Sequence, residues 1–266
     1  MSTFGFIGTG NMGGALARAA AKSLPGECIL LSNRTSAKAA ALAAELGCRA
    51  VDNETIAAEA DFIFLGVKPQ MMEGMLSAIR PVLAARESRF VLVTMAAGLT
   101  MERIRAMAGV DCPVIRIMPN TPCAIGEGIL LYACDSAVTP EEEAEFLSAM
   151  SAAGRVTALA EHLINAGSTI SGSAPAFAAM FMEALADGAV ACGLPRAAAM
   201  EYAAQMLVGT AKLYLEQGRH PGAMKDAVCS PGGSTIQGVR ALEAGGFRSA
   251  VTEAIIATYE KNVALG

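Results

Sequence analysis

A glycine-rich run near the start of the sequence has the spacing of a phosphate-binding loop. The pattern G-x-G-x-x-G is formed by Gly8, Thr9, Gly10, Asn11, Met12 and Gly13. In such a loop the first glycine permits a tight turn, the second lets a pyrophosphate approach the backbone, and the third lets the following helix pack closely. Free amides at the start of that helix attract negative charge. The run therefore predicts a dinucleotide site, and a purely structural turn is the alternative interpretation.

The residues after the next apolar run bear on which dinucleotide would bind. An acid that would hold ribose hydroxyls is absent there, and the sequence reads Ser32, Asn33, Arg34 and Thr35. Arg34 could pair with a 2′-phosphate and its polar neighbours could donate hydrogen bonds, so NADP(H) is preferred over NAD(H). Lys68, after a later apolar run, could add a second cation. The alternative for both side chains is a solvated position without a ligand.

A second run with chemical potential lies far along the chain. Residues 230–235 read Ser-Pro-Gly-Gly-Ser-Thr, and a helical pattern follows from Ile236 to Glu243. Amides and hydroxyls at the start of a helix can hold a small carboxylate. A capped structural turn explains the same residues without a ligand.

The elements that must position these runs follow from hydrophobic periodicity. Five short apolar runs predict strands at Phe4–Ile7, Ile29–Leu31, Phe62–Val67, Phe90–Thr94 and Val114–Met118. Helical patterns lie between and after them at Met12–Ser23, Ser36–Leu46, Gln70–Ala85 and Thr100–Ala108, with a further helix expected to begin at Pro140. Nearly continuous apolar strands alternating with helices indicate a doubly wound parallel sheet covered on both faces. The loops at 95–98 and 119–122 would then join the ligand crevice at the carboxyl ends of the strands.

Beyond His162 the strand signal fades into Ala-rich helical segments separated by glycines. We expect two domains, 1–160 and 161–266, of which the second is all-helical and pairs with a second copy of the chain. The uncharged run Leu163–Met182 is long enough for a bilayer span, but its Asn, Ser, Thr, Gly and Pro residues fit a span poorly. We expect this run to be a buried helical seam at a dimer interface.

Composition argues against several kinds of ligand and bears on the expected compartment. The net charge of −5 argues against a nucleic-acid surface. Seven cysteines without a C-x-x-C pair and two histidines argue against disulfides and a metal site. Near Met1 the sequence shows neither a basic region nor a cleavage site of a targeting signal, so a cytosolic protein without membrane attachment is expected.

Five motifs together resemble the pyrroline-5-carboxylate reductase family. They occur in order at 8–13, 67–70, 118–122, 171–176 and 230–235, and the resemblance covers essentially the whole chain. It implies an N-terminal Rossmann domain, a C-terminal helical dimerisation domain, and dimers that assemble into rings such as decamers. The implied reaction is the reduction of 1-pyrroline-5-carboxylate to L-proline with NADPH or NADH, the last step of proline biosynthesis. Ala174 departs from the pattern, because the family commonly has glycine there.

Residue roles carry over from the resemblance position by position. The implied cofactor site comprises the 8–13 loop with Ser32, Asn33, Arg34, Asn53, Val67, Lys68, Pro69, Ala96, Ala97 and Asn120. The implied substrate site comprises Glu161, Gly232, Gly233, Ser234 and Thr235. We expect the Thr235 hydroxyl to hydrogen-bond the imine nitrogen as hydride reaches the neighbouring carbon.

Two other functions compete with this one. A 3-hydroxyacid dehydrogenase would need a lysine as general acid/base in the second domain, where Lys212 and Lys225 stand outside that family's expected motif. A non-catalytic NADP(H) sensor would keep the glycine loop, but would not need the intact 230–235 run.

Overall fold

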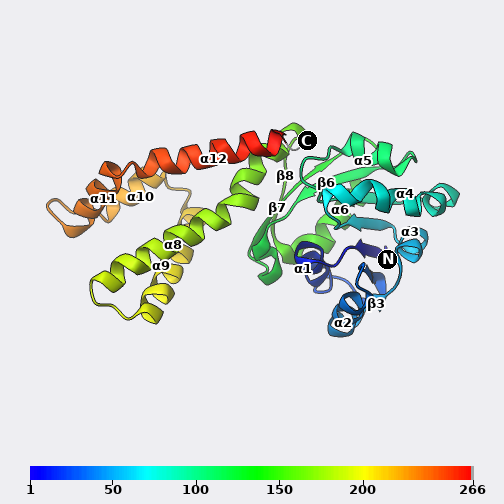
Figure 1. The fold of residues 1–266 in the computed structure, drawn as a ribbon, viewed down its shortest axis with the longest axis horizontal. Helices are drawn as coiled ribbons and strands as arrows, with labels where there is room; N and C mark the ends of the chain where they lie inside the picture. Colours follow the sequence, from blue (N-terminus) through cyan, green and yellow to red (C-terminus); the bar gives the residue numbers. More distant parts are fainter. Residues whose placement is uncertain (265–266) are drawn as a thin grey trace. The chain divides into compact units, whose positions relative to one another are not determined.

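The computed structural model describes residues 1–264, and the chain divides into two compact units (Figure 1). The first unit comprises residues 1–172 together with the chain from Tyr259 onward. The second comprises Ser173–Thr258.

The first unit is built on an eight-stranded sheet of order β3-β2-β1-β4-β5-β6-β7-β8. The strands are β1 Phe4–Ile7, β2 Ile29–Ser32, β3 Arg49–Ala50, β4 Phe62–Leu65, β5 Val91–Thr94, β6 Val114–Met118, β7 Gly128–Cys134 and β8 Gly154–Ala158. Neighbouring strands pair in parallel except β6 and β7, which are antiparallel. Every residue of β1, β2, β4 and β5 is buried, because helices cover both faces of the sheet.

Each face of the sheet has its own apolar core. One face packs against α1 Asn11–Ala20, α2 Ser36–Leu46 and α6 Pro140–Met150. The other packs against α3 Asn53–Glu59, α4 Pro69–Ala85 and α5 Met101–Ala108. Strand β2 lies on one side of β1 and strand β4 on the other, so the strand order reverses beside β1. A ligand crevice of a doubly wound fold forms at that point.

Local signals set several helix ends. The Thr139 hydroxyl and the Glu142 carboxylate form a capping box at the start of α6, which begins at Pro140 as predicted. The Thr100 hydroxyl accepts a hydrogen bond from the backbone of Arg103 and caps α5. Each such cap contributes about 1 kcal/mol to helix stability.

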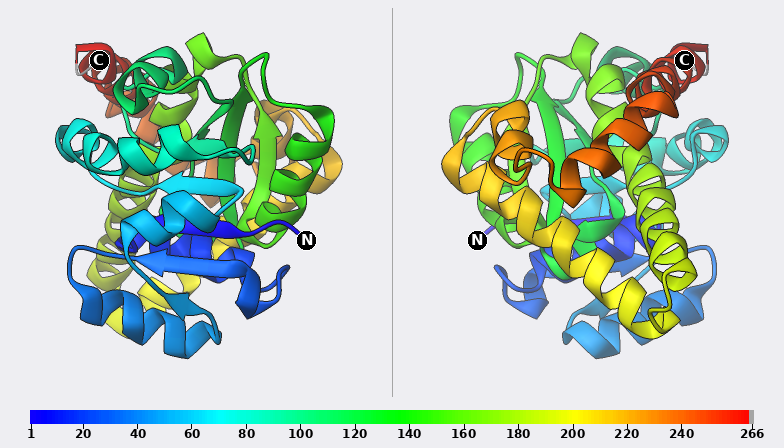
Figure 2. Two further views of the ribbon diagram at one scale, coloured as in Figure 1. Left: turned by 90° about the vertical axis from the view of Figure 1, so that its right-hand side faces the viewer. Right: turned by 90° about the vertical axis from the view of Figure 1, so that its left-hand side faces the viewer.

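Helices alone make up the described chain after β8. A short 3₁₀ turn Glu161–Leu163 leads into α7 Ile164–Ser168 and a π-helical turn Thr169–Ser173. Then follow α8 Ala174–Ala191, α9 Arg196–Gln217, α10 Pro221–Ala227, α11 Ser234–Ala244 and α12 Phe247–Ala264. Helices α8 and α9 lie side by side (Figures 1 and 2). Helix α12 begins in the second unit and ends in the first.

The α/β class with a helical C-terminal part is confirmed, whereas several details differ from the prediction. All five predicted strands exist, but β3, β7 and β8 were missed, and the antiparallel β7 departs from an all-parallel sheet. The contacts within the chain group residues 161–172 with the sheet. The expected domain boundary at residue 160 stays a prediction.

The long apolar run is not buried within a single chain. Glu161–Ala191 is apolar and long enough to cross a membrane by length and composition, yet only 6% of its most apolar window is buried. Ile170 and Met180 are each about two-thirds exposed. That a second copy of the chain covers this surface stays a prediction.

Candidate functional site

Three glycines bring two strand ends and one helix into close contact. Gly8, with φ +97°, donates its amide to the carbonyl of Ser32 at 2.9 Å, and Gly66 donates to Ile7 at 2.7 Å. A Cβ on Gly8 would lie 2.6 Å from the Gly66 carbonyl oxygen, and a Cβ on Gly13 would overlap the Gly8 carbonyl. Only glycine fits these positions, so the loop after β1 is held tightly against the end of β4.

Gly10 differs from these glycines because it faces open space. It is exposed, and apart from its own chain neighbours no atom of residues 1–264 lies within 4 Å of a Cβ built on it. Gly10 is also the N-cap of α1, where no side chain of the described chain caps the helix and the first turn holds no acid. The amides of that turn are therefore available to an anion that approaches over Gly10.

A cavity of about 650 Å³ opens beside this loop. Its walls include seven of the residues predicted for the cofactor: Gly8, Gly10, Asn33, Arg34, Asn53, Val67 and Lys68. The sequence interpretation missed Lys38 in the first turn of α2 and a wall on α4 formed by Gln70, Met71, Gly74 and Met75. The apolar wall and the three exposed cations, Arg34, Lys38 and Lys68, fit a ligand with an aromatic part and a phosphate.

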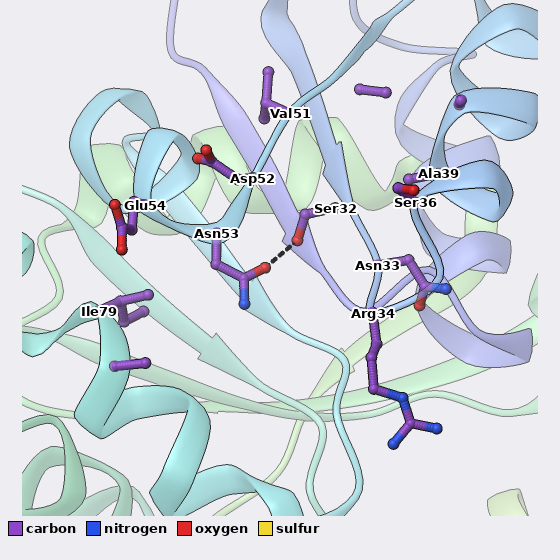
Figure 3. A pocket seen from close by; sticks show the side chains of 13 residues that line it. Ser32, Asn33, Arg34, Ser36, Ala39, Val51, Asp52, Asn53, Glu54 and Ile79 are labelled. Atoms are coloured by element: carbon purple, nitrogen blue, oxygen red, sulfur yellow. Dashed lines mark hydrogen bonds between the residues drawn. The ribbon is translucent and has the colours of Figure 1, made fainter.

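An adjoining cavity of about 730 Å³ shares Asn33, Arg34 and Asn53 with the first (Figure 3). The buried Ser32 hydroxyl donates to Oδ1 of Asn53, which fixes the polar floor of this cavity. Figure 3 shows the Arg34 side chain directed away from Asp52 and Glu54, which also line the cavity. The cation is thus free of carboxylate neighbours on this wall, as recognition of a phosphate requires.

Other predicted cofactor residues lie outside these cavities. Thr9 is buried, and its hydroxyl has no hydrogen-bond partner within residues 1–264. Asn11 and Met12 are the first residues of α1, and Pro69 is the first residue of α4. Ala96 is buried and Ala97 exposed in the turn after β5. Their contact with a cofactor stays a prediction.

Asn120 has a clear role within the fold. Its Oδ1 accepts the amide of Ile129 at 3.0 Å and faces the Cys123 thiol at 3.7 Å. The side chain therefore closes the loop between β6 and β7 and sets the start of β7. Burial raises the pKa of the Cys123 thiol, so this sulfur stays protonated at neutral pH.

A charged cluster that the sequence interpretation missed lies at the centre of β6. Arg116 is 2% exposed and holds Oε1 of Glu161 at 3.4 Å and Oδ1 of Asn165 at 2.8 Å. Glu161 Oε1 also accepts the amide of Met101 at 2.7 Å. Burial lowers the pKa of Arg116, and the Glu161 carboxylate opposes that shift. The available signal was a lone charge inside the apolar run 114–118.

The predicted substrate loop lies in the second unit. The amide of Gly233 donates to the carbonyl of Ser230 at 3.0 Å and closes a turn, and Gly232 has φ +71°. Helix α11 begins at Ser234 with Gly233 as N-cap, and no side chain of the described chain caps it. Ser234 and Thr235 are exposed at this helix start. The arrangement suits a small carboxylate, whereas Glu161 belongs to the first unit.

No metal centre is suggested in the part of the chain that the structure describes. Within residues 1–264, no three His, Cys, Asp or Glu side chains gather as ligands would.

Comparisons with known proteins agree with the geometry. Residues 161–265 match the family model described as pyrroline-5-carboxylate reductase dimerisation, and residues 3–98 match that of NADP oxidoreductase, coenzyme F420-dependent. Pyrroline-5-carboxylate reductase of Escherichia coli is 43% identical over 97% of this chain and 96% of its own length. Pyrroline-5-carboxylate reductase 2 of Bos taurus is 39% identical over 96% and 81%.

Solved structures extend this similarity to three dimensions. The pyrroline-5-carboxylate reductase of Coxiella burnetii has a TM-score of 0.91 at 28% identity, with 100% of this chain and 98% of that chain covered. The Plasmodium falciparum pyrroline carboxylate reductase with NADP bound has a TM-score of 0.88 at 28% identity and the same coverage. The glycine cradle formed by Gly8, Gly13 and Gly66, the helical second unit and these full-length similarities lead to one conclusion: the chain belongs to the pyrroline-5-carboxylate reductase family.

Proposed function

We propose that this chain reduces 1-pyrroline-5-carboxylate to L-proline with NADPH, the last step of proline biosynthesis. The observation that carries the proposal is the 43% identity to the Escherichia coli reductase over 97% of the chain. The glycine cradle in the first unit and the open helix start in the second supply one site for a dinucleotide and one for a carboxylate.

The residues of the first unit fit the cofactor. The free amides at Gly10 would hold the pyrophosphate, because a helix N-terminus without an acidic cap attracts anions. Arg34 and Lys38, which both line the cavity of about 650 Å³, would hold a 2′-phosphate, whereas NADH would lack that interaction. The apolar α4 wall at Met71 and Met75 would accommodate the adenine. When bound, the cofactor supplies a hydride to the imine carbon.

The second unit would hold the substrate through the 230–235 loop. The amides at the start of α11 would bind the substrate carboxylate, with Gly232 and Gly233 giving the turn its shape. The exposed hydroxyl of Thr235 would donate a hydrogen bond at the ring nitrogen, where electron density rises as the carbon is reduced. The ring nitrogen can take its proton from solvent before hydride reaches the carbon, so this chain needs no dedicated proton donor.

The competing dehydrogenase gains no support from Lys225. This lysine pairs with Asp226, and the hydrogen bond between them raises the pKa of the lysine. A lysine that acts as a general base requires a lowered pKa instead. A dehydrogenase that relies on Lys225 is therefore disfavoured.

We further propose a cytosolic enzyme in which dimers assemble into a ring such as a decamer. The chain carries the family's dimerisation domain. Its seven cysteines, all within the described residues, are free thiols, as expected in a reducing compartment. The apolar stretch Glu161–Ala191 is interrupted by a π-helical turn with buried hydroxyls, which favours protein over lipid as its covering.

The test uses the purified protein with 1-pyrroline-5-carboxylate and NADPH. We expect NADPH absorbance to fall while L-proline forms in equal amount, as measured by amino-acid analysis. NADPH binding without turnover would indicate the sensor, and NADP⁺ reduction by a 3-hydroxy acid would indicate the dehydrogenase; either result contradicts the proposed reaction.

A further inference from the structure

Arg116 breaks the pattern of the strand that carries it. Its neighbours Ile115 and Ile117 point into the core beneath α1 and α6, so Arg116 points to the opposite face. There it lies in register with the buried Thr94 of β5 and with Ala133 of β7. A guanidinium at 2% exposure is costly unless it is paired, and such pairs rarely exist for stability alone.

Both partners of Arg116 lie in one short segment. Nη1 contacts Glu161, which precedes α7, and Nη2 contacts Asn165, which lies in the first turn of that helix. Nε is buried and has no partner among residues 1–264. The planar guanidinium thus fixes the point where the chain leaves the sheet. A lysine could not do so, because its ammonium is a compact point charge and cannot reach both partners in this fixed geometry.

Glu161 links Arg116 to the start of α5. Its Oε1 accepts the amide of Met101, the first residue of α5, at 2.7 Å. The carboxylate also lies at the positive end of that helix. The turn that leads into α5, residues 95–100, contains Ala96 and Ala97, which are predicted to border the cofactor. One oxygen of Glu161 therefore serves two donors of the first unit.

A second branch of the cluster reaches the last turns of α12. The carbonyl of Asn165 accepts the Ser168 hydroxyl at 2.8 Å, and the Ser168 oxygen accepts Nδ2 of Asn262 at 3.2 Å. Asn262 lies on the part of α12 that belongs to the first unit. The two segments of the first unit that adjoin the second, 161–172 and the chain from Tyr259, are thus both tied to Arg116.

We propose that Arg116 and Glu161 are a positioning pair: Arg116 holds Glu161, and Glu161 fixes the start of α5 and the adjoining turn instead of contacting the substrate. This inference rests on the proposed function only for its kinetic consequences. It changes the role that the resemblance implies for Glu161 and assigns a role to a strand residue outside the family motifs.

A double-mutant cycle tests the pair. Glu161→Gln leaves the buried guanidinium without an anion, and Arg116→Met leaves the carboxylate without its cation. We expect each change to lower kcat/KM for 1-pyrroline-5-carboxylate about tenfold, within the usual range for contacting residues. The amide oxygen introduced by Glu161→Gln can hold the Met101 amide once the unpaired guanidinium is also removed, so the double variant should exceed both single variants. The Kd of NADPH, measured by fluorescence, should rise in each single variant and recover in the double variant, because Ala96 and Ala97 in the turn before α5 are predicted to border the cofactor.

A second readout requires neither cofactor nor substrate. Amide hydrogen exchange of the peptide spanning 97–103 should quicken in each single variant and return toward wild type in the double variant. The side chain at 161 that accepts the Met101 amide loses its fixed position when one charge is left unpaired and regains it when both charges are removed. Should Arg116→Met fail to fold, Arg116→Lys keeps the charge but cannot hold both partners, and the same quickening is expected.

The matched control is Glu142→Gln. Glu142 pairs with Arg89 at 2.6 Å and accepts the amide of Thr139 at 2.8 Å, so it plays the same two parts at the start of α6, on the other face of the sheet. This variant should lower Tm without changing exchange at 97–103 or the kinetics.

The proposal would be overturned if the two losses in kcat/KM multiplied in the double variant while hydrogen exchange at 97–103 stayed unchanged. Glu161 would then return to the substrate site. Absence of turnover in the wild-type protein would instead contradict the proposed function, and the exchange experiment would still decide on the pair.

Discussion

The carbonyl oxygen of Gly8 occupies the place where a side chain of Gly13 would begin. Because Gly8 itself needs φ +97° and abuts Gly66, the loop cannot move aside without losing its hydrogen bond to Ser32. The tight loop is therefore a condition of the fold as well as of the ligand site.

Gly13→Ala and Gly10→Ala separate these two conditions. The methyl group at 13 should destabilise the first unit by about 2 kcal/mol through overpacking, and Tm should fall. The methyl group at 10 meets open space, so Tm should fall by only about 2 °C, the cost of alanine at a helix N-cap, while the Kd of NADPH rises at least roughly tenfold, since the phosphate loses its approach. Differential scanning calorimetry and fluorescence titration measure the two effects. Equal Tm losses in both variants would contradict this division.

Arg34→Ala should weaken NADPH binding by about tenfold to a hundredfold and leave NADH binding within about twofold, because only NADPH offers a 2′-phosphate for a charge-assisted hydrogen bond. Isothermal titration with both cofactors measures the difference. Arg49→Ala, which removes a similarly exposed arginine paired with Glu59, is the control and should change neither affinity. A parallel loss for both cofactors would remove Arg34 from phosphate recognition.

Thr235→Ala should lower kcat more than it raises KM for 1-pyrroline-5-carboxylate, because the hydroxyl is needed most as electron density rises on the nitrogen. A loss of about a hundredfold in kcat is expected. Thr235→Ser keeps the hydroxyl and should retain much of the rate, which makes it the matched control. Steady-state kinetics with an unchanged kcat in Thr235→Ala would remove the residue from the chemical step.

The sheet could be predicted where its strands are buried on both faces. Phe62–Leu65 has four apolar residues in succession, and such a run carries its own signal. Gly154–Ala158 is half-exposed and includes Arg155, so no apolar run marks β8. Strand β3 has only two residues, both exposed. These strands exist because a neighbouring strand pairs with them, which periodicity alone does not contain.

The residues of the candidate site also fall into two groups, those that local sequence predicts and those that only the fold brings together. The glycine loop and Arg34 are local to single strand ends and follow from spacing. The α4 wall at Met71 and Met75 depends on which helix face meets the crevice, and this is decided only when the helix docks. Arg116 gave a signal, a charge in an apolar strand, but its partners lie 45 and 49 residues later and are joined by the fold alone.

A second copy of the chain should cover the exposed apolar side chains of the second unit. Met180, Tyr202 and Leu215 are each at least 60% exposed, an arrangement that marks an interaction surface. Met180→Glu should shift sedimentation velocity toward a smaller species and lower Tm, because association with a second copy stabilises the folded chain. Ile125→Glu, at an equally exposed apolar residue of the first unit, is the control. An unchanged assembly in Met180→Glu would place the interface elsewhere, and the wild-type mass would distinguish a dimer from a ring.

Alkaline pH should destabilise the first unit through two thiols and one phenol that are buried or partly buried. Burial raises the pKa of Cys112 from 9.0 to about 11, of Tyr132 from 10.0 to about 12 and of Cys134 from 9.0 to about 12. The unfolded chain releases these protons first, so the stabilisation is complete below about pH 9 and is lost as pH rises toward about 12. Tm measured by circular dichroism should fall across this window, less steeply in Tyr132→Phe. The tyrosinate absorbance difference between wild type and Tyr132→Phe should appear near pH 12; its appearance near pH 10, the ordinary value for tyrosine, would contradict the prediction.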